Sequence, residues 1–135
     1  MKILIVEDDP LSQQLLLRYL KDQGEMVIAE DGERALAEFR AAHVDSRPFD
    51  LICLDIMLPL LDGQAVLRQV RLAEESWGVG GLAGCKVLML TALRDAGNVM
   101  TAFRSQCEGY LSKPISKERL FSEIRSLGLP LIENE

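Results

Sequence analysis

Five short apolar runs, separated by amphipathic helical patterns, constrain the fold of this chain more than any other feature of its sequence. The runs are continuous rather than alternating, which is typical of strands buried on both faces of a parallel sheet. Four are strong and one is weak, and they cover residues 3–6, 26–29, 51–54, 87–90 and 110–111. Their strict alternation with helices predicts an α/β fold, a doubly wound five-stranded parallel sheet.

Capping residues and apolar stripes mark the predicted helices. Helix starts are predicted at Asp9, Asp31, Asp62, Asp95 and Ser116. In the first helix, Leu11 is expected on the buried stripe and Gly24 is expected to end the helix. His43, the only histidine, has no partner motif, and we interpret it as a solvated side chain.

The segment from Glu74 to Gly84 is unusual because it carries four of the ten glycines and the only tryptophan, Trp77. A phosphate-binding glycine loop leads from a strand into a helix, whereas this segment leaves a helix and enters a strand. We therefore interpret it as a mobile surface loop.

A length of 135 residues fits a single domain with one core. We expect residues 1–128 to form that domain. Residues 129–135 have no partner pattern, so we expect a frayed tail or the start of a linker.

Charge and cysteine content narrow the class of partner. A net charge of −6 and a pI near 4.9 argue against direct nucleic-acid binding. No apolar stretch approaches the roughly 18 residues of a membrane span, and the start is no signal peptide, so we expect a cytoplasmic protein with no membrane partner. Cys53 and Cys107 lie in or beside apolar segments, which predicts buried free thiols.

Polar side chains follow the predicted strands where they end. Glu7 and Asp8 follow the first strand, Asp55 the third, Thr91 the fourth, and Lys113 comes shortly after the fifth. Open α/β sheets bind ligands at this edge, where the strand order reverses. With strand order 2-1-3-4-5, the two acids of the first strand and the acid of the third would flank one crevice.

Three close carboxylates either acquire raised pKa values or hold a cation. Mg²⁺ suits this set because it prefers oxygen ligands. Lys113 and Thr91 would stabilise charge on a transferred phosphoryl group, and Asp55 is a competent nucleophile for it. Each feature alone has a structural explanation, such as a helix cap or a turn former. Their joint occurrence at successive strand ends predicts phosphoryl-transfer chemistry.

The sequence resembles the receiver domain of bacterial response regulators, the CheY-like family, over about residues 1–127. The resemblance rests on four motifs in order: ILIVEDD, LICLDIMLPLLDG, VLMLTA and GYLSKP. It implies that Asp55 is the phosphoacceptor and that Mg²⁺ is the cofactor. It further implies a metal site formed by Glu7, Asp8, Asp55 and the backbone carbonyl of Met57, in which Asp8 binds the metal directly and Glu7 binds it largely through water.

The resemblance also implies a switch. Thr91 and Tyr110 match the switch pair, Lys113 matches the phosphate-binding lysine, and the Lys113–Pro114 peptide is expected to be cis. The phosphoryl donor would be a sensor histidine kinase or a phosphotransfer protein. The output domain or partner would be controlled through the face of the fourth helix, fifth strand and fifth helix. A phosphorylation-dependent homodimer stays open, as do the cognate kinase and the output.

Three features depart from the family pattern: the segment from Glu74 to Gly84 is longer than usual, position 106 is not glycine, and positions 57 and 93 are apolar. Met57 lies two residues after Asp55, and Leu93 lies two residues after Thr91. In the family these two positions flank the phosphoryl group, and here both are apolar. We therefore expect slow self-dephosphorylation, and faster loss of phosphate with Asn at 57 and Glu at 93. Gln106 stands where the family often has glycine, so the fourth helix must end differently.

Two rival interpretations remain. The first is an unphosphorylated pseudo-receiver that serves only as an interaction module. The second is a small Mg²⁺-dependent phosphatase with Asp55 as nucleophile, although the haloacid dehalogenase class would need an aspartate where Met57 stands. We favour a signalling domain that assists only its own phosphorylation and dephosphorylation, rather than an enzyme that turns over an external ester.

Overall fold

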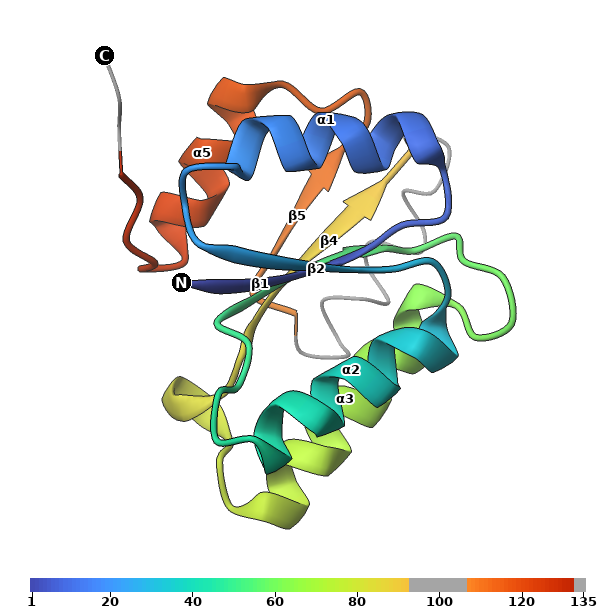
Figure 1. The fold of residues 1–135 in the computed structure, drawn as a ribbon, viewed down its shortest axis with the longest axis vertical. Coiled ribbons are helices and arrows are strands. Elements are labelled where there is room, and N and C mark those ends of the chain that lie inside the picture. Colours follow the sequence, from blue (N-terminus) through green and yellow to red (C-terminus); the bar gives the residue numbers. More distant parts are fainter. Residues whose placement is uncertain (93–106, 133–135) are drawn as a thin grey trace.

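The computed structural model describes residues 1–92 and 107–132, which form a layered α/β sandwich (Figure 1). The strands are β1 (Lys2–Val6), β2 (Glu25–Ala29), β3 (Leu51–Asp55), β4 (Lys86–Thr91) and β5 (Gly109–Ser112). The helices are α1 (Pro10–Leu20), α2 (Gly32–Val44), α3 (Gly63–Trp77) and α5 (Lys117–Ser126), with a short 3₁₀ helix η1 (Gly81–Ala83). The helix predicted from Asp95, together with Leu93 and Gln106, lies outside the described residues.

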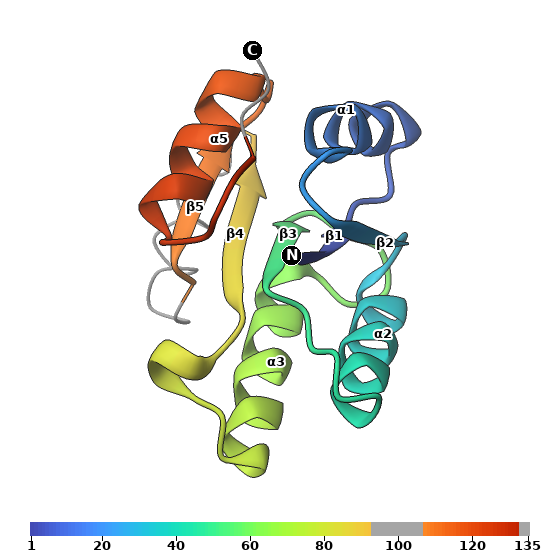
Figure 2. The ribbon, with the colours of Figure 1, turned by 60° about the vertical axis from the view of Figure 1, so that its left-hand side comes forward.

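The sheet has the predicted order β2-β1-β3-β4-β5, and every neighbouring pair is parallel. Figures 1 and 2 show α2 and α3 on one face of the sheet and α1 and α5 on the other. Leu4 and Val6 of β1 join the core under α2 and α3, whereas Ile3 and Ile5 join the core under α1 and α5. Both faces of the central strands are therefore buried, which explains why their apolar runs are continuous.

The predicted caps on Asp9, Asp31, Asp62 and Ser116 are confirmed, since each side chain accepts a hydrogen bond from a first-turn backbone N–H. The expectation for Leu11 is wrong, because its side chain is 70% exposed.

The buried face of α1 is set by Leu16 and Leu20. At 3.6 residues per turn, Leu11 lies roughly 140° around the helix from Leu16 and about 180° from Leu20, so it points away from the sheet.

Gly24 does not end α1, which stops at Leu20 with Lys21 as its C-cap. Gly24 instead precedes β2 with a φ of +149°, and a Cβ there would lie 1.8 Å from the carbonyl oxygen of Met1. The glycine is needed because the backbone at the start of β1 approaches it so closely.

The interpretation of Glu74 to Gly84 as a surface loop is wrong for its first part. Helix α3 continues to Trp77 and ends at Gly78, whose φ of +73° is that of a left-handed C-cap. Glu74 is buried, and its carboxylate accepts hydrogen bonds from Arg71 Nη1 at 2.7 Å and from the backbone N–H of Cys85 at 2.6 Å. This helical end is thus tied to the start of β4.

The interpretation of His43 as a solvated side chain is also wrong. Its ring stacks on Trp77 with 3.7 Å between ring centroids and 3° between the planes. Phe39 stacks on the same indole, with 5.6 Å between centroids. These contacts join α2 to the end of α3. No motif in the sequence indicates that His43 makes this contact.

The segment after α5 is not frayed as far as Ile132. Leu129 and Leu131 pack against the core under α1 and α5. The side-chain amide of Gln23 donates to the carbonyl oxygen of Ile132 at 2.6 Å and accepts from its backbone N–H at 2.7 Å. The domain boundary at residue 128 stays a prediction, but the four residues after it are docked.

The cysteines Cys53, Cys85 and Cys107 are free and buried, as predicted for the first and last. Burial raises the pKa of the Cys53 thiol to about 12. Burial also raises the pKa values of the Cys85 and Cys107 thiols. These groups are therefore protonated and poorly nucleophilic near neutral pH.

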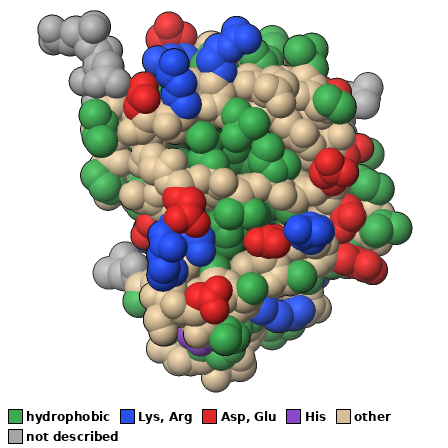
Figure 3. All heavy atoms as spheres, in the orientation of Figure 1, with side chains coloured by type: hydrophobic (Ala, Val, Ile, Leu, Met, Phe, Trp, Pro, Cys, Tyr) green, Lys and Arg blue, Asp and Glu red, His purple; other side chains and the backbone are tan. Residues whose placement is uncertain are grey.

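Apolar side chains gather at the centre of one surface, over the edge strand β2 and between α1 and α2 (Figure 3). Met26, Val27 and Ile28 of this strand are only partly buried. Within residues 1–92 and 107–132, no helix is both long enough and apolar enough to span a membrane.

Candidate functional site

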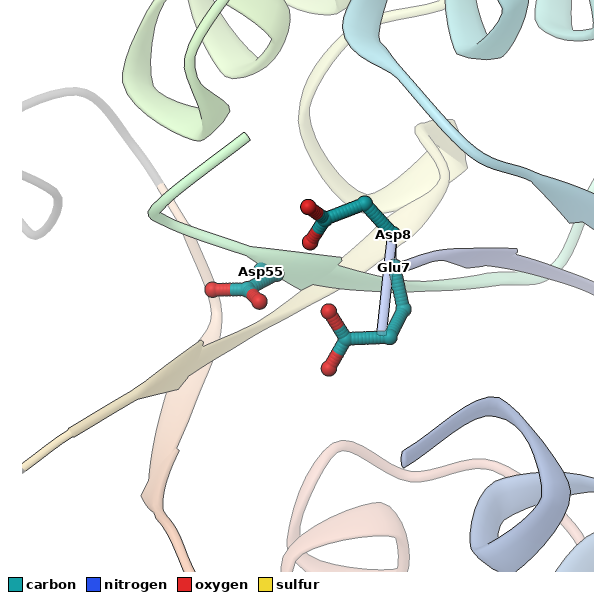
Figure 4. A group of neighbouring side chains, drawn as sticks. All are labelled: Glu7, Asp8 and Asp55. Atoms are coloured by element: carbon teal, nitrogen blue, oxygen red, sulfur yellow. The ribbon is translucent and has the colours of Figure 1, made fainter. Parts of the chain in front are cut away.

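Three carboxylates meet at the carboxyl ends of β1 and β3. Glu7 and Asp8 follow β1 directly, Asp55 is the last residue of β3, and the strands pair in parallel beside them. One oxygen from each side chain lies within 4.8 Å of the others, and the three groups converge on one space (Figure 4). Glu7 and Asp55 are buried and Asp8 is exposed. The structure thus brings together the acids that the sequence assigns to a single crevice.

Lys113, directly after the edge strand β5, reaches the same crevice. Its Nζ lies 2.6 Å from Oε1 of Glu7 and 2.9 Å from Oδ2 of Asp55. Its backbone N–H donates to the carbonyl oxygen of Thr91 at 2.7 Å, which continues the β4–β5 pairing past the strand end. The Lys113–Pro114 peptide is cis, as the resemblance implies.

The loop after β3 holds Asp55 in place. The backbone N–H of Met57 donates to Oδ1 of Asp55 at 2.9 Å, and the N–H of Gly63 donates to the carbonyl oxygen of Ile56 at 2.9 Å. A Cβ at Gly63 would lie 2.3 Å from the carbonyl oxygen of Asp55. Only glycine lets α3 begin this close to the strand end.

Gln13 is a supporting residue that the sequence did not reveal. Its side-chain amide, one turn into α1, donates to the carbonyl oxygen of Glu7 at 2.6 Å. A glutamine inside an amphipathic helix carries no signal for such a role. Its contact restrains the turn that presents the two acids after β1.

Burial and a hydrogen bond shared with Asp55 raise the pKa of Glu7 from its ordinary 4.5 to about 7, against the attraction of Lys113. Burial lowers the pKa of the Lys113 ammonium, but its hydrogen bonds to Glu7 and Asp55 outweigh that effect and leave it raised. The ammonium therefore keeps its charge near neutral pH. The acids hold more negative charge than this one ammonium can balance.

Thr91, Tyr110 and Met57 are the remaining predicted residues that the structure describes. Thr91 is buried at the end of β4, where its hydroxyl donates to the carbonyl oxygen of Ala92 at 3.0 Å. Tyr110 lies on β5, paired with Met89 of β4, and its side chain is 43% exposed. The side chain of Met57 is 57% exposed.

The donor set fits a hard divalent cation. Carboxylate oxygens are the ligands that Mg²⁺ takes from proteins, usually one or two carboxylates with water completing the shell. Among the residues that the structure describes, one exposed and two buried carboxylates with a single ammonium leave an excess of negative charge at the crevice. A divalent cation would balance it and lower the pKa of Glu7.

A flavodoxin-like sheet with an acidic crevice at its switch point is a fold and site that known proteins share. The family model for the response regulator receiver domain matches residues 3–125. The chain therefore belongs to the response regulator receiver family, the signalling domains of two-component systems.

Individual relatives agree with this assignment. The probable transcriptional regulator ycf27 of Cyanophora paradoxa is 35% identical over 127 residues, which cover 93% of this chain and 47% of that protein. The transcriptional regulatory protein TcrA of Mycobacterium tuberculosis is 34% identical, with 93% and 45% covered. The chain thus spans about half the length of these curated relatives.

Solved structures agree as well. Chemotaxis protein CheY4 of Vibrio cholerae superposes with a TM-score of 0.77 at 27% sequence identity, and the match covers 93% of this chain and 97% of that one.

Proposed function

We propose that this domain accepts a phosphoryl group on Asp55 with the help of Mg²⁺ and Lys113, and that the added charge switches its surface. The observation that carries the proposal is the ammonium of Lys113 bonded at once to Glu7 and Asp55, beside the exposed Asp8. This arrangement joins a nucleophile, a cation site and a fixed positive charge in one crevice.

In the transfer step, a carboxylate oxygen of Asp55 bonds to phosphorus as the bond between phosphorus and the donor's imidazole nitrogen breaks. The donor is a phosphohistidine of a sensor kinase or phosphotransfer protein. Glu7, Asp8, Asp55 and the backbone carbonyl of Met57 would hold Mg²⁺, which supplies charge neutralisation at the phosphoryl oxygens. Lys113 leaves the carboxylate and pairs with the same oxygens, so its charge acts where the negative charge develops.

The switch step follows from the added charge, about −1.5 to −2 at neutral pH. The phosphoryl oxygens compete with Ala92 for the hydroxyl of Thr91. Movement of Thr91 opens space toward which the exposed ring of Tyr110 can turn. The change biases an existing equilibrium and emerges on the surface around β5 and α5, where an output domain or partner would read it.

The test is to incubate the protein with Mg²⁺ and acetyl phosphate and to follow intact mass. We expect a gain that stops near one phosphoryl group per chain, and no gain for Asp55→Asn. Asp50→Asn, an exposed carboxylate at the opposite edge of the sheet, is the matched control and should label like the parent. Labelling of Asp55→Asn at the parental rate would refute the proposal, and continued turnover of an external ester would favour the phosphatase interpretation.

Met57 bears on how long the phosphoryl group lasts. An exposed apolar side chain beside Asp55 offers no hydrogen bond to an attacking water. We expect slow hydrolysis in the parent and faster hydrolysis with Met57→Asn combined with Leu93→Glu. Decay of labelled protein after removal of acetyl phosphate measures this, and equal lifetimes would contradict it.

A further inference from the structure

A cavity of about 300 Å³ lies where the strands begin, at the edge of the sheet opposite Asp55. Figure 1 shows η1 and the ends of α2 and α3 gathered near the start of β4. The cavity is lined by residues of these elements, by the segments that precede β3 and β4, and by Leu129 after α5. Its volume is at the lower end of the range of about 300–1,000 Å³ that small-molecule sites occupy.

One wall of the cavity is aromatic and already ordered. Phe39, His43, Phe49 and Trp77 all line it. The rings of His43 and Phe39 both stack on Trp77, at 3.7 and 5.6 Å between centroids. An aromatic lining that is already packed favours an aromatic ligand, because the rings need not be reordered when it binds.

The charged groups of the lining differ in how far they are already engaged. Asp50 accepts the backbone N–H of Lys2 at 2.8 Å, and Glu74 accepts from Arg71 and from the backbone of Cys85. Both acids therefore have their charge stabilised by the protein itself.

Lys86 also lines the cavity and is partly buried. Among residues 1–92 and 107–132, its ammonium forms no ion pair or hydrogen bond. It is the cationic group of this lining that remains available to a ligand.

We propose that this cavity binds a compact planar aromatic anion of the aryl carboxylate class. The ring would lie against the wall around Trp77, and the carboxylate would meet the ammonium of Lys86. The site is separate from phosphoryl transfer, because α3 begins beside Asp55 and reaches Trp77 about 21 Å further along its axis.

The experiment uses 2-naphthoate as probe, with neutral 2-naphthamide as its matched control, in metal-free buffer without any phosphoryl donor. Trp77 is the only tryptophan, so its emission reports directly on the cavity wall. Amide NMR spectra of the full chain map the site independently. We expect naphthoate to change Trp77 emission saturably, to shift resonances of the lining, and to bind more tightly than naphthamide.

Two variants separate charge from shape. Lys86→Met should weaken naphthoate binding about tenfold, the size expected for one lost charge-assisted hydrogen bond, and leave naphthamide unchanged. Ala83→Leu, at the mouth, should weaken both probes. Lys21→Met, at the C-cap of α1, and Asp55→Asn should bind like the parent, which separates this site from phosphorylation. Equal affinity for the two probes, shifts confined to another surface, or full binding by Lys86→Met would overturn the proposal.

Discussion

The two edges of the sheet hold buried charge in different ways. At the edge where strands begin, Arg71 Nη1 pairs with Glu74 at 2.7 Å and Nη2 with Glu108 at 2.6 Å. Each acid also accepts a backbone N–H, from Cys85 and Val87 respectively. At the other edge, acids converge on a single ammonium and the pKa of one of them rises to about 7.

The difference teaches how to distinguish structural charge from functional charge. A network in which every acid already accepts strong hydrogen bonds needs no ligand to balance its charge. Removing one member leaves another charge buried without its partner, which destabilises the fold. A cluster with excess negative charge is incomplete, and its shifted pKa marks the place where a cation and a phosphoryl group would act. Substitutions at the edge where strands begin should therefore lower stability, whereas substitutions at the other edge should mainly lower the rate of phosphorylation.

The largest effect is expected from Arg71→Met. It leaves Glu74 buried with only one backbone donor, so the free energy of unfolding should fall by about 3–5 kcal/mol. Urea unfolding measures this. The control Arg34→Met breaks the exposed pair with Glu38 and should cost no more than about 0.5 kcal/mol. The comparison fails at this edge if both variants lose the same stability.

Lys113→Met tests the other edge through rate. Loss of the fixed ammonium should slow labelling of Asp55 by acetyl phosphate about 10²–10³-fold at saturating Mg²⁺, because the developing phosphoryl charge loses a donor. Initial rates of mass gain measure this. Lys117→Met, on the surface of α5, is the control and should label at the parental rate. A parental rate for Lys113→Met would remove that residue from the mechanism.

Because the pKa of Glu7 is raised in the folded protein, we expect the free energy of unfolding of the metal-free protein to depend on pH. Its folded-state pKa, about 7, exceeds its ordinary 4.5, so the stabilisation is fully present below pH 4.5 and is lost as pH rises through 7. The loss is on the order of 3 kcal/mol at most. Urea unfolding in EDTA between pH 4.5 and 8 should show this slope in the parent.

Two comparisons isolate that slope. Glu7→Gln should lose it, because the side chain no longer ionises. Saturating Mg²⁺ should flatten it in the parent, because the cation stabilises the ionised carboxylate. Identical pH profiles for parent and Glu7→Gln would show that Glu7 does not control it.

The smallest effect concerns Leu60, which has a φ of +67° and a side chain that is 76% exposed in the loop after β3. Leu60→Gly removes the strain of a left-handed conformation, but glycine also makes the unfolded chain more flexible. The strain is the larger effect, so we expect a net stabilisation of about 0.5–1 kcal/mol. Leu72→Gly, an exposed leucine within α3, should destabilise by about 0.8 kcal/mol. Thermal unfolding compares the two, and the same sign for both would contradict this account.

Sequence reasoning succeeded where one local rule decides the outcome. Continuous apolar runs located the strands, and side-chain caps located helix starts. The crevice of Glu7, Asp8, Asp55 and Lys113 was accessible because parallel topology gathers the carboxyl ends of strands at one edge.

It failed where a side chain's surroundings come from distant segments. Glu74 looked like loop sequence because the backbone N–H of Cys85, just before β4, reaches its carboxylate only in the folded chain. The stacking of His43 on Trp77 joins two helices for which the sequence offers no pairing rule.

The clamp between Gln23 and Ile132 has a mechanical consequence. Two hydrogen bonds of 2.6 and 2.7 Å fix the segment after α5 to the turn that leads into β2. A fluorophore or fused module attached after Ile132 would be tethered at this turn, near β1. The four anchored residues would add nothing to the length of its linker. Tension applied there would load the α1–β2 turn before it could unwind α5.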